Sequence, residues 1–374
     1  MNIIIAPDSF KGSVSAIEAG AAIKKGILSE VPDAVVDVIP MADGGEGTLD
    51  TLLFATNGKR FQVEATGPLG KIIDTQYGVL GDEQTAVIEM ALISGLPMVP
   101  EEKRNPFFTT TYGIGEVILQ AVNDGYRNFI IGLGGSATND GGLGMLQALG
   151  VTFLDQDGKP VRPFGYGVNT VQRVSFSTLD PRIRECTFQI ASDVENPLCG
   201  LKGATAVFGP QKGANPEMVS ELDSALSNYA RLVEAEIGLN FQDVKGAGAA
   251  GGLGFAFLTL GGEMVSGAKL VGEAARLKEK LGSADFVITG EGQSDDQTLY
   301  GKVPGYIGKL ALERNVNAIL ISGSLGRGYE QLYQYFLSCD SIATGPMPLH
   351  ECMNHAEDLL YKKAKNIARL LARK

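Results

Sequence analysis

The feature that most constrains the fold is a glycine-rich segment between a short apolar run and a helical pattern. Residues 129–131 form an apolar run of the length of a buried strand, and Gly132, Gly134 and Gly135 follow it. Apolar residues then recur at helical spacing up to Gly150, which ends the helix. Glycine lets the backbone approach a ligand, and a helix N-terminus favours an anion. The segment therefore predicts a strand, a glycine loop suited to an anion, and a helix.

Three interpretations of this loop remain open from the pattern alone. Residues 132–137 match the dinucleotide-binding pattern G-x-G-x-x-G/A, and Asp155 follows a strand-like run at the position of a ribose-binding acid. The second interpretation is a phosphoryl-transfer loop, in which Asn139 and Asp140 turn towards phosphate or metal. The third is a tight connection between strand and helix that binds no ligand.

Composition and charge bound the domain count, the partners and the compartment. A chain of 374 residues predicts about two domains, and a net charge of −11 disfavours nucleic acid or an anionic membrane as the main partner. The longest uncharged run, residues 246–262, is short and broken by glycine compared with a membrane helix. The four cysteines are scattered without a C-x-x-C motif, which fits reduced thiols, and no signal peptide is apparent. We therefore expect a cytoplasmic protein.

The two ends of the chain share one pattern, and the middle has another. Residues 3–6 and 35–39 predict buried strands, each followed by a loop and a helix, and Ser15 with Glu18 forms a capping box for the first helix. This alternation is typical of a parallel, doubly wound sheet. Residues 61–90 instead predict short strands joined by turns, whereas the chain from Asp285 returns to alternating strands and helices. Both ends can therefore build one sheet, with the middle inserted.

Further strands place polar residues at strand ends. Residues 188–191 predict a strand that leads to Asp193, and Asn196-Pro197 is a turn signal. Residues 286–289 and 318–321 predict buried strands, each followed by a glycine loop. The remaining expected helices cover residues 110–123, 217–237, 270–281, 302–313, 330–337 and 356–373, and a second glycine-rich segment at 246–254 predicts a closely packed helix entry.

Acidic residues and lysines gather in the predicted strand-end loops. The acids are Asp8, Asp43, Glu46, Asp140, Asp193, Glu291, Asp295 and Asp296, and the lysines are Lys11 and Lys302. Glycine loops for anions, carboxylates for Mg²⁺ and lysines for phosphate are the groups that phosphoryl transfer needs. Only two histidines occur, both near the C-terminus, so general-base chemistry by histidine is disfavoured.

Six motifs in this order resemble those of the bacterial glycerate kinases of the class that lacks a MOFRL domain. They are residues 6–12 (A-P-D-S-F-K-G), 41–48 (M-A-D-G-G-E-G-T), 132–142, 193–198 (D-V-E-N-P-L), 246–254, and 289–302 with its T-G-E-G, D-Q-T and G-K segments. The resemblance runs from Met1 to the last helix.

The resemblance implies an α/β protein of two domains. A flavodoxin-like or Rossmann-like parallel-sheet domain would come from both chain ends (residues 1–66 and 283–374), and a mixed α/β domain would be inserted (residues 67–282), with the active site in the cleft between them. It also implies an ATP- and Mg²⁺-dependent kinase of D-glycerate that typically gives 2-phosphoglycerate. Phosphorylation at the 3-hydroxyl and an NAD-dependent hydroxy-acid reductase remain as alternatives, and a homodimer is left open.

We assign roles to individual residues as hypotheses within this resemblance. Asp193 is the candidate base for the glycerate hydroxyl, and Lys11 is the second catalytic candidate. Candidates for substrate binding are Asp8, Ser9, Asp43 and Asn196. Candidates for phosphate or nucleotide binding are Gly134, Gly135, Ser136, Asn139, Gly248, Gly251 and Lys302. Glu291 and Asp295 are the candidate Mg²⁺ ligands, with Asp43 and Asp140 as rivals.

Overall fold

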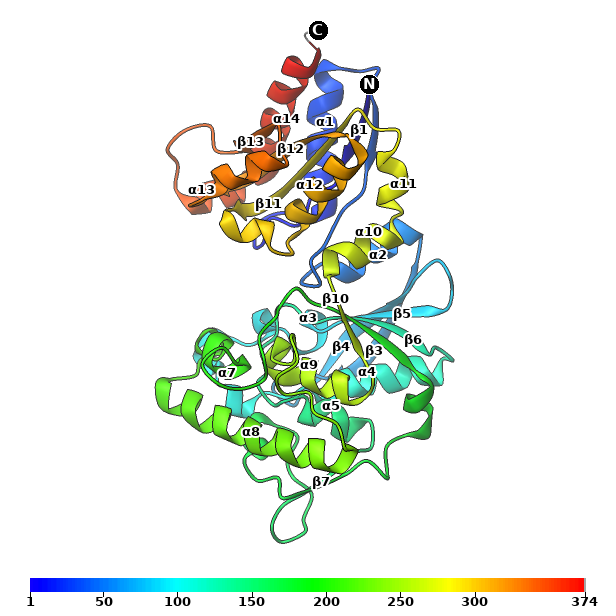
Figure 1. The fold of residues 1–374 in the computed structure, drawn as a ribbon, viewed down its shortest axis with the longest axis vertical. Helices are drawn as coiled ribbons and strands as arrows, with labels where there is room; N and C mark the ends of the chain where they lie inside the picture. Colours follow the sequence, from blue (N-terminus) through cyan, green and yellow to red (C-terminus); the bar gives the residue numbers. More distant parts are fainter. Residues whose placement is uncertain (373–374) are drawn as a thin grey trace. The chain divides into compact units, whose positions relative to one another are not determined.

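A computed structural model describes residues 1–372 and divides them into two compact units (Figure 1). Unit 1 comprises Met1–Asp43, Asp50–Thr56 and the chain from Ser266 onwards, and unit 2 comprises Gly44–Leu49 and Asn57–Val265. Each unit has its own sheet and its own core. The domain ranges expected from the sequence stay a prediction.

The sheet of unit 1 is parallel and has five strands in the order β13-β12-β11-β1-β2. The strands are β1 (Asn2–Ile5), β2 (Val35–Val38), β11 (Phe286–Ser294), β12 (Asn317–Leu325) and β13 (Ser338–Ser341). Taken in chain order, this is the flavodoxin-like arrangement 2-1-3-4-5. The expected α/β class is confirmed, although the sequence analysis missed the short strand β13.

Two helices far apart in the sequence, α1 (Ala16–Glu30) and α14 (Ala356–Ala372), lie side by side on one face of this sheet (Figure 1). Ile3 and Ile5 belong to the core that they cover, whereas Ile4 points to the other face, as strand alternation requires. The Ser15 capping box at the start of α1 is confirmed, because Ser15 Oγ accepts from the Glu18 N–H (3.2 Å).

The helices that follow unit 2 in the chain correct one expectation. Residues 270–281 were expected to form one helix, but α10 (Gly267–Ala274) and α11 (Leu277–Leu281) are separate. Arg276 lies between them with a φ of 54°, a left-handed conformation that no continuous helix contains. The other helices of this unit are α12 (Val303–Arg314), which packs on β11 and β12, and α13 (Leu349–Asn354).

Strand β11 also runs further than its apolar residues predict. The expected strand ended at residue 289, but pairing with β12 continues to Ser294 opposite Leu325. Glycine is needed at position 290, because a Cβ there would lie 2.0 Å from the Ile321 carbonyl oxygen. Glu291 is therefore presented by a strand rather than by a loop.

The sheet of unit 2 is mixed and has six strands in the order β10-β9-β6-β5-β4-β3. The parallel strands are β5 (Thr85–Glu89), β6 (Asn128–Gly132), β9 (Thr187–Ala191) and β10 (Glu263–Val265), and the antiparallel pair is β3 (Lys59–Thr66) and β4 (Ile72–Val79). Strand β10 was missed in the sequence. The expected strand at 151–154 is β7 (Thr152–Leu154), which pairs only with β8 (Arg173–Ser175).

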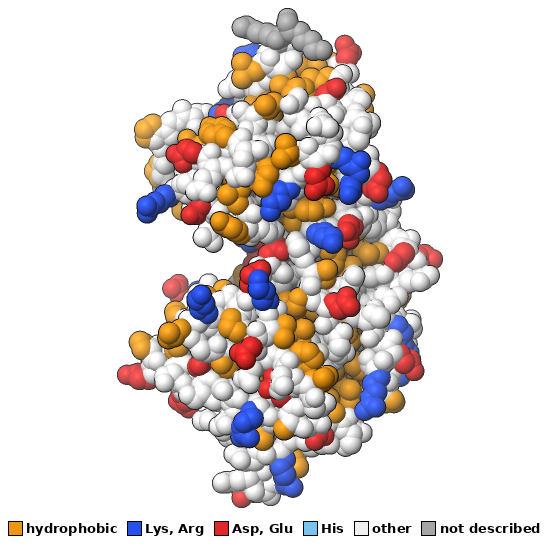
Figure 2. All heavy atoms as spheres, viewed as in Figure 1, with side chains coloured by type: hydrophobic (Ala, Val, Ile, Leu, Met, Phe, Trp, Pro, Cys, Tyr) orange, Lys and Arg blue, Asp and Glu red, His pale blue; other side chains and the backbone are white. Residues whose placement is uncertain are grey.

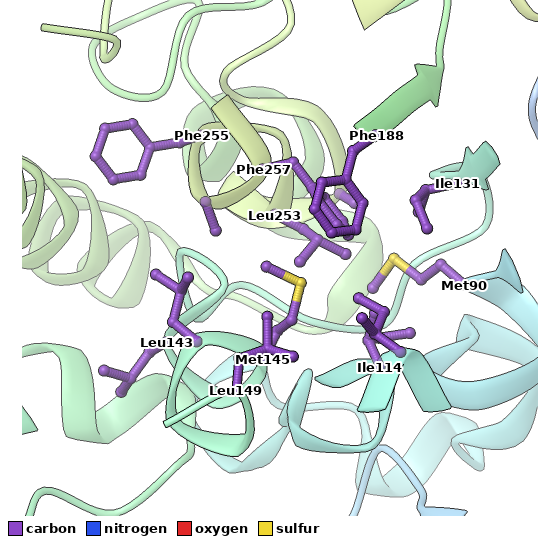
Figure 3. Packing of buried hydrophobic residues seen from close by; sticks show 14 of the residues in the cluster. Met90, Ile114, Ile131, Leu143, Met145, Leu149, Phe188, Leu253, Phe255 and Phe257 are labelled. Carbon is purple, nitrogen blue, oxygen red and sulfur yellow. The ribbon is translucent and has the colours of Figure 1, made fainter. Parts of the chain in front are cut away.

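The helices of unit 2 pack an apolar core against this sheet, and Figure 3 shows part of it. They are α3 (Ala91–Ser94), α4 (Tyr112–Asn123), α5 (Leu143–Ala148), α6 (Gly165–Val168), α7 (Ala204–Phe208), α8 (Pro216–Ile237) and α9 (Ala249–Thr259), and α2 (Thr48–Thr56) connects the units in sequence. Met145 and Leu149 of the α5 segment lie with Leu253 and Phe257 of α9 and with Phe188 of β9 in this core. The segment after the glycine loop is thus anchored by apolar packing.

The remaining surface features are ordinary. Acidic and basic side chains are interspersed on the face shown in Figure 2. Among the described residues, no helix combines the length and apolarity needed to cross a bilayer. Residues 330–337, expected as an α-helix, form a 3₁₀ turn at Tyr329–Gln334.

We expect Gly26→Ala to lower the free energy of unfolding by roughly 1–3 kcal/mol, although alanine favours helices more than glycine does. A Cβ at position 26 would lie 2.5 Å from the Tyr361 carbonyl oxygen and 2.8 Å from Ala364 Cβ, so α1 and α14 would have to separate. Chemical denaturation followed by circular dichroism measures the change. Gly345→Ala is the matched control, because a Cβ there meets nothing within 4 Å. Equal stability of both variants would contradict the prediction.

Candidate active site

The loops that follow β1 and β11 lie where the strand order of unit 1 reverses. Strand β2 lies on one side of β1 in the sheet, and β11 lies on the other side. The carboxyl ends of β1 and β11 therefore border a crevice. The Asp8 N–H donates to the Gly290 carbonyl oxygen (2.8 Å), which fixes the first loop against β11. Ligands of doubly wound sheets bind at such a crevice.

A cavity of about 830 Å³ opens at this position in unit 1. One part of its wall is polar and contains six residues expected from the sequence: Asp8, Ser9, Lys11, Asp43, Glu291 and Lys302. The rest is largely apolar and includes Phe10, Ile342, Met347, Leu349 and Met353. The cavity can therefore hold a ligand with one charged end and one apolar end. We call it the unit-1 cavity.

Asp8 is the most perturbed carboxyl group in the unit-1 cavity. Burial, together with the negative charge of Asp43, raises the pKa of Asp8 to about 8, although the Ser9 N–H donates to its carboxylate (2.7 Å) and Lys11 is nearby. Lys11 Nζ lies 3.0 Å from Asp43 Oδ2, but this lysine is largely exposed, so the pair contributes about 1 kcal/mol at most. Asp8 is therefore mostly protonated at neutral pH in the absence of a cation.

Glu291 and Lys302 form a second polar group in the unit-1 cavity. Glu291 Oε1 accepts from the hydroxyls of Ser294 (2.9 Å) and Thr298 (2.7 Å), and Lys302 Nζ lies 3.5 Å from Glu291 Oε2. Burial raises the pKa of Glu291, and the charge of Lys302 opposes that shift. Asp295 does not line the cavity; its carboxylate accepts from the Gln297 N–H (3.0 Å) and caps a 3₁₀ turn.

The carboxylate oxygens of the unit-1 cavity are suited to a Mg²⁺ ion that is also bound to a phosphate group. Mg²⁺ is usually held by one or two carboxylates together with substrate phosphates and water. Asp8, Asp43 and Glu291 offer such carboxylates, and a divalent cation would offset the repulsion between Asp8 and Asp43. Within residues 1–372 no three or more His, Cys, Asp or Glu side chains form a metal-binding group on their own. The assignment of Glu291 and Asp295 stays a prediction.

The glycine loop of the sequence analysis lies in unit 2, directly after β6. Glycine is required at position 134, because a Cβ there would lie 2.3 Å from Gly45 Cα, and the Gly134 N–H donates to the Gly44 carbonyl oxygen (3.0 Å). Gly135 has a φ of 74°, which disfavours other residues. The segment after Asp43 and the glycine loop are thus in backbone contact within unit 2.

A second cavity, of about 470 Å³, borders this loop, and we call it the unit-2 cavity. Its wall includes Gly134, Gly135 and Ser136 together with Arg104 and Lys212.

Lys212 is fully buried in this wall. Its Nζ donates to Ser136 Oγ (2.8 Å) and to the Thr138 carbonyl oxygen (2.7 Å), and burial lowers its pKa to about 7. No role for Lys212 was expected from the sequence. The available signal was a single lysine between Pro210 and Gly213, in a turn surrounded by glycine and apolar residues.

Asn139 and Asp140 both make hydrogen bonds within unit 2, and the nucleotide-binding role of Asn139 stays a prediction. Asn139 is buried, and its Nδ2 donates to Thr205 Oγ1 (2.9 Å). The buried Asp140 carboxylate accepts from the N–H and the hydroxyl of Thr111, both at 2.8 Å, and from the N–H groups of Gly142 and Gly144. The oxygens of Asp140 are thus used within the loop, and its rival role as a metal ligand stays a prediction.

The second glycine-rich segment has a packing explanation. A Cβ at Gly248 would lie 2.2 Å from the Pro197 carbonyl oxygen, and one at Gly251 would lie 2.0 Å from the Thr138 carbonyl oxygen. Neither glycine lines the unit-2 cavity, although their neighbour Ala250 does. Asn196 belongs to the same contact, because its carbonyl oxygen accepts from the Gly248 N–H (2.9 Å). The ligand-binding roles of Asn196, Gly248 and Gly251 stay predictions.

Asp193 follows strand β9 by two residues, as expected. The Val194 N–H donates to Ser192 Oγ (3.3 Å), and Val194 lines the unit-2 cavity. The next acid, Glu195, pairs with Lys245 at the surface (2.8 Å). The turn that carries Asp193 therefore adjoins this cavity through Val194.

The dinucleotide-binding interpretation of the glycine loop is wrong. In that fold the ribose-binding acid ends the parallel strand next to the first one. Here Asp155 follows β7, which is not in the sheet of β6, and Asp155 Oδ1 accepts from the N–H groups of Asp157 and Lys159 in its own turn. Helix α5 begins only at Leu143, so it does not directly follow the glycine loop at residues 132–135.

Comparison with known proteins identifies the family of this chain. The model of the glycerate kinase family matches residues 3–372. The chain is 47% identical to a glycerate kinase of Bacillus subtilis over 370 residues (98% of this chain, 97% of the relative). It is 45% identical to a glycerate 2-kinase of Escherichia coli over 374 residues (100% of this chain, 98% of the relative).

A solved structure gives the same result. The chain superposes on the glycerate kinase 2 structure from Salmonella typhimurium LT2 with a TM-score of 0.87 and 43% identity, covering 99% of this chain and 98% of that one. The match to the family model and to these relatives extends over nearly the whole chain, so it includes both units. The chain therefore belongs to the glycerate kinase family, whose members are kinases that act on an alcohol group.

Proposed function

We propose that this enzyme transfers the γ-phosphoryl group of ATP to D-glycerate and that it requires Mg²⁺. The observation that carries the proposal is the unit-1 cavity, which is lined by three carboxylates and two lysines from β11 and from the segments that follow β1, β2 and β11. Phosphoryl transfer depends on charge stabilisation and positioning, and these groups can provide both. The apolar part of the same cavity suits a nucleobase.

We propose the 2-hydroxyl as the acceptor. The support is the identity of 45% to the Escherichia coli protein named glycerate 2-kinase, over the full length of this chain. Phosphorylation of the 3-hydroxyl is the alternative product.

In the proposed reaction Mg²⁺ would be held by Asp8, Asp43 or Glu291 and would offset the charge of the phosphates. Lys11 and Lys302 would neutralise phosphate oxygens, and Ser9, whose buried hydroxyl oxygen has no hydrogen-bond partner among the described residues, would contact the same ligand. Asp193 would accept the proton of the acceptor hydroxyl.

The compartment is also a proposal. All four cysteines are free thiols, three of them partly exposed, and such thiols persist in a reducing compartment. We therefore propose a cytoplasmic enzyme. A homodimer remains an open expectation.

The reaction product distinguishes the two hydroxyls directly. Purified protein is incubated with D-glycerate, ATP and Mg²⁺, and enolase is then added. We expect immediate formation of phosphoenolpyruvate, because enolase accepts 2-phosphoglycerate. If phosphoenolpyruvate forms only after phosphoglycerate mutase is added, the product is 3-phosphoglycerate. Absence of ATP consumption would refute the proposed kinase activity.

We expect Asp193→Asn to lower kcat by roughly 10²–10⁴-fold, because the amide cannot accept the proton of the hydroxyl. Steady-state kinetics and circular dichroism measure turnover and folding. Glu195→Gln is the matched control two residues away, at an exposed ion pair with Lys245. Near-normal turnover of Asp193→Asn would remove this residue from the role of base.

We expect Asp8→Asn to flatten the pH dependence of stability in metal-free protein. The folded-state pKa of Asp8 is raised from 3.8 to about 8, so the folded state binds more protons than the unfolded state in this window. The stabilisation by Asp8 is fully present below pH 4 and is lost as pH rises through about 8, an effect on the order of a few kcal/mol. Denaturation curves between pH 4 and 9 test it. If the free energy of unfolding changed with pH in the same way in the wild type and in Asp8→Asn, the prediction would be contradicted.

A further inference from the structure

The unit-2 cavity contains two cationic side chains with no carboxylate partner within the described chain. Lys212 is buried and makes two hydrogen bonds, both to neutral oxygens, whereas an ammonium group has three donors. Arg104 Nε is buried and has no hydrogen-bond partner among residues 1–372. A buried cationic donor without an acceptor is costly, so such a group indicates that an anionic ligand completes the site.

The fold brings these two side chains together by a close backbone contact. Gly213 follows Lys212 with a φ of 92°, and a Cβ there would lie 2.1 Å from the Arg104 carbonyl oxygen. Only glycine allows the turn that carries Lys212 to pack directly on the backbone of Arg104. The pair is therefore a built feature of unit 2 and not a chance meeting of surface side chains.

The glycine loop adds backbone donors to the same wall. The N–H groups of Gly134 and Ala137 donate to Gly44 and Ser94, but those of Gly135 and Ser136 have no acceptor in the described part of the chain. Gly135 and Ser136 both line the unit-2 cavity. The unit-2 cavity is thus lined by two cationic side chains and by two residues whose N–H groups have no acceptor in the described part of the chain.

We propose that Arg104 and Lys212, with the loop at Gly135 and Ser136, bind the carboxylate of the acceptor hydroxy acid. The identity of the acid as D-glycerate rests on the proposed function. This assignment differs from the expectation that Gly134, Gly135 and Ser136 bind a phosphate of the nucleotide.

The net charges of the two cavities favour a carboxylate ligand in the unit-2 cavity. Arg104, Lys212 and the exposed Glu46 are the charged side chains of the unit-2 cavity, and with Lys212 protonated they sum to one positive charge, which one carboxylate balances. The unit-1 cavity instead has three carboxylates and two lysines, so a phosphate chain bound there needs a metal ion. A bare monoanion therefore suits the unit-2 cavity, and a metal-bound nucleotide suits the other.

The protonation of Lys212 provides an independent signature. Burial lowers its pKa to about 7, while the charge of Asp140 opposes the shift, and Arg104 and Glu46 are the other charged groups of the wall. A bound carboxylate favours the ammonium form. Binding of D-glycerate near pH 8 is therefore accompanied by proton uptake.

Kinetics of Lys212→Met and Arg104→Gln test the proposal with D-glycerate, ATP and Mg²⁺. We expect each variant to raise the KM for D-glycerate about 10- to 100-fold, the effect of losing a hydrogen bond to a charged group, and to change the KM for ATP less than about twofold. Lys202→Met, an exposed lysine ten residues earlier, is the matched control and leaves both constants unchanged. Circular dichroism confirms folding, and Arg104→Gln is a second test should Lys212→Met fail to fold.

Thermal protection separates failure of this inference from failure of the proposed function. We expect D-glycerate to raise the Tm of the wild type, and glycerol, which lacks the carboxylate, to have no effect; both variants lose the protection. This holds even if wild-type protein shows no kinase turnover, which would refute only the proposed function. The inference is overturned if D-glycerate gives no protection, if glycerol protects equally, or if inorganic phosphate alone protects. A rise confined to the KM for ATP, or unchanged constants in both variants, overturns it as well.

Discussion

The shape of the unit-2 cavity depends on the two hydrogen bonds that the buried ammonium group of Lys212 donates. Its hydrogen bonds to Ser136 and Thr138 tie the turn at residues 210–213 to the loop after β6. Asp140 fixes the same loop by accepting two hydrogen bonds from Thr111, so two buried ionisable side chains hold the loop. Neither charge neutralises the other by direct contact, which leaves the lysine available to an anion.

Unit 1 uses charge in the opposite way. Its cavity gathers carboxylates at the switch point of a parallel sheet, and burial keeps Asp8 protonated at neutral pH. A carboxyl group in this state avoids repulsion from Asp43 until a cation binds. Under the proposed function, metal binding would release a proton in unit 1, and under the further inference, anion binding would take up a proton in unit 2.

The sequence predicted the parts of the fold that local patterns determine. The apolar runs placed β1, β6 and β11, and the Ser15 capping box placed the start of α1, because these signals depend on neighbouring residues. The short strands β10 and β13 were missed, since β10 has only three residues, β13 has a single apolar residue, and each is defined by its pairing partner. The extension of β11 to Ser294 likewise depends on pairing with β12.

The candidate site was predictable only where residues follow a strand of known direction. Asp8 and Glu291 lie close because β1 and β11 are neighbours, and strand ends indicate such proximity. Lys212 and Arg104 lie at the ends of two short 3₁₀ turns more than a hundred residues apart. A close contact at Gly213 joins them, and no local pattern encodes it. The glycines at 134, 248 and 251 look alike in sequence, yet each is explained by a backbone that approaches it. The glycine-rich motifs in this chain are therefore explained first by close packing of the backbone. The cationic side chains beside them indicate where an anion can bind.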